Sequence, residues 1–196
     1  MTIFPGDPEP RFVPADIVPP WRVTQLHMGT HTGTHIDAPA HFLPHGKSID
    51  QYPPERFFVE GIVVPALGYG GDEPIGRDIF TDYLALLPIC GAVLVRTGWD
   101  RYWGSEGYMR HPYLSWEAAE LLVEQGVGIV GVDALSVDST AQETDHAHAT
   151  LLSNEALIVE NLARLDQLIP GRLYHFAFLP LALVGLDGSP VRAVAW

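Results

Sequence analysis

Two nearly continuous apolar runs in the middle of the chain frame a segment with the spacing of a helix. Residues 91–97 and 127–132 are rich in valine and isoleucine, which predicts two buried strands. Between them, residues 115–125 predict a helix that Ser115 caps and Gly126 ends. A strand, a crossover helix and a second strand predict parallel pairing.

Other segments carry weaker patterns of the same kinds. Residues 23–27 alternate like a strand, and residues 173–179 predict one more central strand. Residues 61–67 predict another strand, which Pro65 would place at a sheet edge or beside a bulge. Residues 78–87 carry apolar positions at helical spacing and predict a helix.

The length and composition of the chain indicate how many domains it forms and of which class. The chain has 196 residues, of which 47% are hydrophobic and 18% charged, which suits one globular core. We therefore expect a single α/β domain over residues 1–196, with a mixed sheet or partial barrel and helices packed outside. No run reaches the roughly 18 apolar residues that span a bilayer. No signal peptide is visible, and the lone Cys90 cannot form an intrachain disulfide, so we expect a cytoplasmic protein.

Charge and histidine content narrow the function. The formal net charge is −13, which disfavours nucleic acid and anionic membranes as partners. Nine histidines are present, and five of them fall within nineteen residues: His27, His31, His35, His41 and His45. That density is typical of a metal site.

The segment from His31 to His41, with the sequence HTGTHIDAPAH, is the strongest chemical signal. His31, His35 and Asp37 supply the nitrogen and oxygen ligands that zinc or manganese prefers. In an extended segment, His35 and Asp37 would point to the same face of a strand, and Gly33 would let the backbone turn or approach the metal closely. His41 lies beyond these ligands and could move protons. The alternative is a polar loop whose histidines are satisfied by ordinary hydrogen bonds.

Further candidates lie toward the C-terminus, where spacing alone leaves several pairings open. His146 competes with His148 as a ligand, and Asp133 could be an outer carboxylate or have a structural role in a turn. Glu160 begins a segment with the apolar spacing of a short helix. The acidic and histidine residues of this region are Glu143, Asp145, His146, His148, Glu155 and Glu160.

An aromatic segment between residues 99 and 116 has two interpretations. It could pack in the core and a dimer interface, or it could form an apolar wall or lid over an aromatic substrate. Its members are Trp99, Tyr102, Trp103, Tyr108, Tyr113 and Trp116.

The sequence gives no support for a dinucleotide-binding site or a serine nucleophile. The pattern Gly-x-Gly-x-x-Gly over residues 126–131 follows a predicted helix and forms a strand, whereas a dinucleotide site needs the reverse order. No Gly-x-Ser-x-Gly elbow is present.

Residues 31–41 match the signature His-x-Gly-Thr-His-x-Asp-x-Pro-x-His, and by it the chain resembles the cyclase family, which includes bacterial kynurenine formamidases (arylformamidases). The resemblance continues at residues 4–8 (FPGDP), 96–99 (RTGW) and 131–138 (GVDALSVD), and at His148 followed by Glu160-Asn161-Leu162. It covers nearly the whole chain. It departs at the start, where relatives carry a further strand containing Asp-Leu-Ser.

The resemblance implies a swivelling β/β/α fold that is usually homodimeric. It assigns one divalent metal to His31, His35 and Asp37. It assigns a second metal to Asp37 again, together with His148 and Glu160. Two ions per chain are implied, with Zn²⁺ first and Mn²⁺ as the alternative.

The resemblance also implies a reaction. His41 corresponds to the proton donor and acceptor, and Phe4 to an aromatic that lines the substrate pocket. The family activity is metal-dependent hydrolysis of a small amide-type C–N bond by metal-activated water, with N-formyl-L-kynurenine as the first candidate substrate. The alternatives are a cyclase or dehydratase, a cyclic imide or lactam hydrolase with the same metal site, and a non-catalytic metal-binding protein. The expected partners are a small-molecule substrate and further copies of the chain, as a homodimer or higher homo-oligomer.

Overall fold

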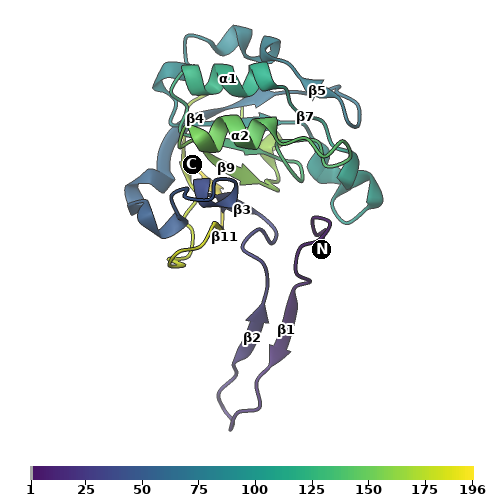
Figure 1. Cartoon of the computed structure of the whole chain (residues 1–196), viewed down its shortest axis with the longest axis vertical. Helices are drawn as coiled ribbons and strands as arrows, with labels where there is room; N and C mark the ends of the chain where they lie inside the picture. Colours follow the sequence, from purple (N-terminus) through teal and green to yellow (C-terminus); the bar gives the residue numbers. More distant parts are fainter. Residues whose placement is uncertain (1) are drawn as a thin grey trace.

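The computed structural model describes residues 2–196, and a mixed eight-stranded sheet forms the centre of this part of the chain. Helices α1 (Trp116–Glu124) and α2 (His146–Ser153) lie next to each other on one face of the sheet (Figure 1). The α/β class with a mixed sheet is therefore confirmed. In order across the sheet, the strands are β11 (Gly188–Pro190), β3 (His35–Asp37), β9 (Leu157–Glu160), β8 (Ile129–Val132), β6 (Ala92–Arg96), β4 (Phe58–Pro65), β10 (Tyr174–Ala177) and β12 (Val194–Ala195).

The middle of the sheet is parallel and buried on both faces. Strands β4, β6, β8 and β9 pair in parallel, as the two apolar runs predicted. Within β6, Val93 and Val95 pack toward the helices, whereas Leu94 packs into a second apolar cluster on the opposite face. Because both faces are covered, nearly every position of these strands is apolar, and this explains the continuous runs in the sequence.

Helix α1 begins after Ser115 and ends before Gly126, as the sequence predicted. The Ser115 hydroxyl accepts a hydrogen bond from the Ala118 N–H at 3.2 Å, which satisfies one free donor of the first turn. Gly126 follows the helix with φ +77°, a conformation that glycine adopts without strain. The helix therefore returns the chain to the sheet at β8.

Three of the weaker predictions need correction. Strand β4 lies inside the sheet, so the expected edge position of Pro65 is wrong. Pro65 is the last residue of β4, and β10 pairs only with Phe58–Gly61, so no strand faces its nitrogen on that side. The predicted helix over residues 78–87 is a 3-10 helix, Arg77–Tyr83, because no side chain caps it and Pro88 follows. Strand β10 is one position from the sheet edge and is not central.

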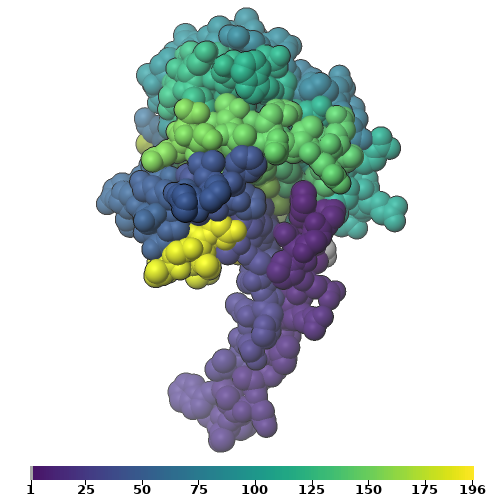
Figure 2. Space-filling model, in the orientation of Figure 1, coloured from purple at the N-terminus to yellow at the C-terminus, as the bar shows by residue number. Residues whose placement is uncertain are grey.

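A hairpin formed by β1 (Arg11–Pro14) and β2 (Thr24–His27) projects from the body of the molecule (Figures 1 and 2). Strand β2 was predicted from its alternation. A small parallel pair, β5 (Pro74–Ile75) and β7 (Tyr113–Leu114), lies beside the main sheet.

Short 3-10 helices make many of the connections. None of the helices in residues 2–196 is both long and apolar enough to cross a membrane. The 3-10 helices are η1 (Pro39–His41), η2 (Ile49–Gln51), η3 (Pro54–Phe57), η4 (Arg77–Tyr83), η5 (Leu87–Ile89), η6 (Trp99–Tyr102), η7 (Glu106–Arg110) and η8 (Leu165–Gln167).

Candidate metal centre

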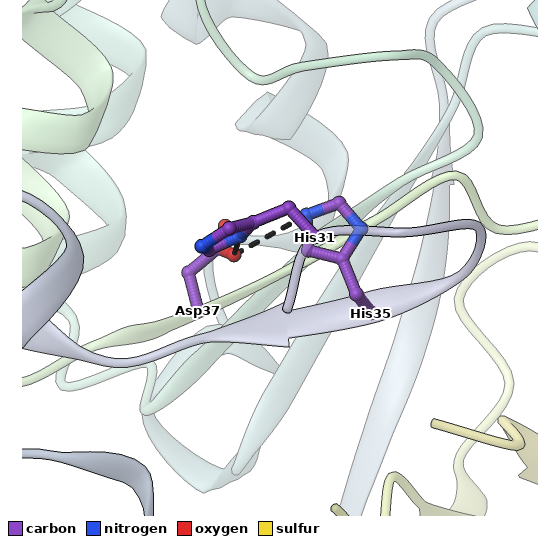
Figure 3. A group of neighbouring side chains, drawn as sticks. All are labelled: His31, His35 and Asp37. Atoms are coloured by element: carbon purple, nitrogen blue, oxygen red, sulfur yellow. Dashed lines mark hydrogen bonds and ion pairs between the residues drawn. The ribbon is translucent and has the colours of Figure 1, made fainter. Parts of the chain in front are cut away.

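Strands β3 and β9 bring three of the predicted ligands together. In this antiparallel pair His35 lies directly opposite Glu160, and directly opposed residues share one face of a sheet. Asp37 is two residues beyond His35 on β3 and points to the same face, as the sequence predicted. All three side chains are buried. Figure 3 shows Asp37, His35 and the neighbouring His31 converging on one point.

His31 comes from the loop before β3, and the backbone of that loop orients the imidazole of His35. Gly33 has φ +71°, and the position of a Cβ there would be open, so glycine is needed for the turn and not for close approach. The Gly33 carbonyl lies 2.8 Å from His35 Nδ1. Because a carbonyl can only accept, Nδ1 carries the proton, and His35 Nε2 is left to face Asp37. Gly188 of β11 leaves room for His31, since a Cβ there would lie 3.0 Å from His31 Cε1.

The two oxygens of Asp37 face different histidines. Oδ1 lies 2.6 Å from His31 Nδ1 and 3.2 Å from His35 Nε2. Oδ2 lies 3.9 Å from Nε2 of His148, which is on α2. The same His148 nitrogen is 3.6 Å from Glu160 Oε1. Asp37 therefore stands between two groups of donor atoms.

These donors fit a divalent metal. In each group, His31–His35–Asp37 and Asp37–His148–Glu160, the ligand atoms lie within 4.8 Å of one another. Donors of one zinc ion, with bonds of about 2.0–2.2 Å, lie at most about 4 Å apart, so only small movements are needed. Asp37 Oδ2 is buried and has no hydrogen-bond partner among the described residues, and an orphaned buried carboxylate oxygen is costly unless a cation or donor meets it.

The carboxylates of the cluster favour positive charge on the neighbouring imidazoles. Burial opposes a charge on His31, but its hydrogen bonds to Asp37 and Asp187 prevail and raise its pKa to about 10. Burial likewise opposes a charge on His148, and Asp138, Glu160 and Asp37 raise its pKa to about 9. The site thus attracts positive charge strongly, which a bound cation would supply in place of protons.

His41 lies beside this cluster at the end of η1. Its ring centroid is 3.9 Å from that of His31 and 5.6 Å from that of His148. Burial, together with the charges on His31 and His148, lowers the pKa of His41, although Asp37 and Asp187 partly offset the effect. A neutral imidazole near pH 7 can accept a proton.

Asp187 is an acidic neighbour that the sequence analysis did not single out. Its Oδ2 lies 3.0 Å from His31 Nε2 and 3.6 Å from His41 Nδ1. It lies between Gly185 and Gly188 in a polar turn, and no local pattern distinguishes it from other acidic surface residues.

A pocket of about 690 Å³ opens onto these side chains. Phe4 lines it, as the resemblance implied, with an exposed fraction of 42%. None of the six aromatic residues between positions 99 and 116 lines it, and Trp99, Tyr108 and Tyr113 are buried. The core-packing interpretation of that segment therefore holds for these three, and the wall or lid is not formed within this chain. Polar lining residues from the loop before α2 are Ser139, Thr140, Glu143, Thr144 and Asp145.

The contacts of the three remaining candidate residues, His146, Asp133 and Glu160, distinguish a ligand role from a structural one. His146 Nε2 lies 2.9 Å from the Leu114 carbonyl and is in neither group around Asp37. Asp133 accepts hydrogen bonds from the backbone N–H groups of Thr97 and Gly98, which is the turn role. Glu160 ends strand β9, so the short helix expected to begin there is wrong. Its apolar neighbours face the two sides of the sheet and not one side of a helix.

Comparisons with known proteins show the family and the fold of the chain. The family model described as "Putative cyclase" matches residues 1–139. The kynurenine formamidase of Paracidovorax citrulli is 35% identical, over 98% of this chain and 89% of its own length. Isatin hydrolase A from Ralstonia solanacearum superposes with a TM-score of 0.82 at 27% identity, covering 96% of this chain and 81% of that one. A "predicted metal-dependent hydrolase" from Bacillus stearothermophilus gives a TM-score of 0.74 at 27% identity, covering 95% and 86%.

Proposed function

This chain belongs to the cyclase family, and on that premise we propose that it hydrolyses small formamides, with N-formyl-L-kynurenine as the first candidate. More broadly, it is a metal-dependent hydrolase of C–N bonds other than peptide bonds. The observation that carries the proposal is the position of Asp37, whose two oxygens face separate groups of histidine and carboxylate donors. His31, His35 and Asp37 would hold one metal, and Asp37, His148 and Glu160 a second.

A divalent metal bound there would lower the pKa of water and polarise a carbonyl oxygen. In the overall reaction, the water oxygen bonds to the formyl carbon, the C–N bond breaks, and the products are an amine and formate. His41 is the base that takes a proton from water and returns it to the leaving nitrogen. Its Nδ1 faces Asp187, which leaves Nε2 for this transfer. Phe4 forms an apolar wall for the aryl part of the substrate.

The test is a panel of formamides, lactams and cyclic imides offered to the metal-loaded protein. We expect N-formyl-L-kynurenine to be hydrolysed with release of formate. If no member of the panel loses its C–N bond while two metals are bound, the protein is a non-catalytic metal-binding protein and the proposal is wrong.

Lactam opening is the second candidate, because isatin hydrolase A superposes closely on this chain and isatin is a cyclic amide. The same donor set and the same base would serve, with the amine retained in the ring-opened product. A higher kcat/KM for isatin than for N-formyl-L-kynurenine would select this candidate. Release of a dehydrated or cyclised product without addition of water would instead select the cyclase or dehydratase.

Metal stoichiometry tests the second group of ligands. His148→Ala and Glu160→Gln should each reduce occupancy from about two metals per chain to about one, with most activity lost. His146→Ala is the matched control on the same helix and should keep both metals. Its Nε2 contacts the Leu114 carbonyl, and its Nδ1 lies 3.6 Å from Asp138 Oδ1, the oxygen that does not contact the His148 ring. Elemental analysis of each purified variant measures the number of metal ions per chain. Unchanged occupancy in both ligand variants would mean that the site is mononuclear.

Phe4 should affect binding more than chemistry. Phe4→Ala removes an apolar aromatic that lines the pocket and has no group that can ligate a metal or move a proton, so KM should rise more than kcat falls. Steady-state kinetics with N-formyl-L-kynurenine measures both. An unchanged KM would assign Phe4 to packing of the N-terminal segment.

The homodimer remains a prediction, and the β1–β2 hairpin is the surface that favours it. Phe12, Trp21 and Leu26 on this hairpin are each more than half exposed, and a two-stranded hairpin alone is marginally stable in water. Light scattering should give twice the mass of the chain, and Phe12→Ser with Trp21→Ser should halve it. Val184→Ser, on an exposed apolar residue of the body, should not. A wild-type monomer would contradict the prediction.

A further inference from the structure

Asp138, the last residue of the 131–138 motif, has no role in the proposed reaction, yet it is buried and makes an extensive set of contacts. Its Oδ2 lies 2.8 Å from His148 Nδ1 and accepts the backbone N–H of His148 at 2.8 Å. Its Oδ1 accepts the backbone N–H of Ala147 at 3.0 Å. One carboxylate thus fixes both the first turn of α2 and the ring of His148.

The contact with the ring determines which nitrogen of His148 remains free. A carboxylate accepts from Nδ1–H, so a proton is held on Nδ1, and Nε2 is the nitrogen that would give up its proton to a metal. Nε2 is the atom that faces Asp37 Oδ2 at 3.9 Å and Glu160 Oε1 at 3.6 Å. Metal-ligating histidines commonly donate their other ring N–H to a carboxylate, which fixes the tautomer and increases the basicity of the ligand nitrogen.

The residue before Asp138 orients the other ligand of the same group. The Val137 backbone N–H donates to Glu160 Oε1 at 2.9 Å. Two consecutive residues after β8 therefore hold His148 and Glu160, which come from α2 and β9. Because neither ligand is next to the other in the chain, this short segment is what relates them.

We propose that Asp138 is a positioning residue for the second metal, setting the tautomer and direction of His148 from outside the ligand set. This inference rests on the proposed two-metal function. Asp138 also joins the site to the pocket wall: the Thr144 hydroxyl donates to Asp138 Oδ1 at 3.3 Å and accepts the Ser139 N–H at 2.8 Å. Both Ser139 and Thr144 line the pocket.

The test compares Asp138→Asn with Asp133→Asn by calorimetric Zn²⁺ titration of the metal-free protein. Asparagine keeps one oxygen and replaces the other by an NH₂ group, so it cannot accept both from the Ala147 N–H on one side and from the His148 N–H and Nδ1–H on the other. Asp138→Asn should bind the first ion as wild type does and the second roughly 10- to 100-fold more weakly. Asp133 is a similarly buried carboxylate whose hydrogen bonds, within residues 2–196, are to the Thr97 and Gly98 backbone N–H groups and the Thr97 hydroxyl. Asp133→Asn should therefore leave both affinities unchanged.

A second measurement needs no variant. Nitrogen-15 spectra of histidine-labelled wild-type protein loaded with Zn²⁺ should place the His148 proton on Nδ1, and a proton on Nε2 would overturn the inference.

Equal second-ion affinity in a folded Asp138→Asn protein would overturn the inference too, as would an equal loss of second-ion affinity in Asp133→Asn. If wild type binds two ions and lacks hydrolase activity, the proposed function fails and the role of Asp138 stands. A wild type that binds one ion contradicts both the two-metal proposal and this role.

Discussion

Exhaustive chelation should abolish turnover of N-formyl-L-kynurenine, and Zn²⁺, Mn²⁺ or Co²⁺ should restore it. The physical reason is that the two groups of donors around Asp37 would hold a metal that activates water. The pocket serines, Ser136 and Ser139, accept backbone N–H bonds at 3.2 and 3.1 Å. The Thr140 hydroxyl lies 2.9 Å from His111 Nε2, so activity that survives removal of the metal would point to this pair as the source of a nucleophile. Cys90 is buried and is not among the residues that line the pocket.

The measurement is activity against metal content through chelation and re-addition, with circular dichroism to verify that the metal-free protein is folded. Return of activity with Mg²⁺ alone would argue against the imidazole-rich ligand set, since Mg²⁺ prefers oxygen donors. Full activity in a verified metal-free preparation would end the hypothesis of a metal-dependent reaction.

The second large effect separates the base from the ligands. His41→Ala should keep the full metal content while kcat falls by roughly two to four decades, the usual contribution of general acid–base catalysis. His35→Ala should lose metal as well as activity, because His35 Nε2 is fixed toward Asp37 by the Gly33 carbonyl. His45→Ala, four residues after His41 and outside all candidate groups, is the control and should be unaffected.

Metal analysis and kinetics on the same preparations distinguish the outcomes. His41 also forms a possible donor group with His31 and Asp187. If His41→Ala empties the site, His41 is a ligand and the assignment of the base is wrong.

The part of the site that the sequence predicted is the part that depends on local geometry. His35 and Asp37 share a face because strand residues two apart always do. The turn at Gly33 follows from a positive φ that glycine tolerates. The same holds for helix α1, whose cap and terminating glycine are both visible in the sequence.

The remainder depends on contacts between distant segments. Glu160 stands opposite His35 only because β3 and β9 pair in one register, and nothing near Glu160 in the sequence indicates this. Its neighbours suggested a helix because apolar residues facing both sides of a buried strand can resemble helical spacing. The family resemblance, and not spacing, identified His148 and Glu160 as partners of Asp37.

The sequence considered alone suggested Asp133 as an outer carboxylate, whereas the carboxylates that contact the candidate ligands from outside the two groups around Asp37 are Asp138 and Asp187. Asp138 and Asp187 are acidic residues in loops, where most acidic residues are only solvated. Their importance comes from the imidazole each one meets: His148 at 2.8 Å and His31 at 3.0 Å. Of the two strands of the exposed hairpin, only β2 was predicted, because its polar and apolar residues alternate. Strand β1 is a short segment bounded by prolines and carried no strand prediction.

Asp37 tests the central claim most directly, because it is the one side chain shared by both groups of donors. The measurement is metal content and formamide hydrolysis of Asp37→Asn, which keeps the shape of the side chain and removes its charge. We expect a folded protein that binds neither ion tightly and has no measurable turnover. Asp37→Asn protein with wild-type metal content and wild-type turnover would contradict the account.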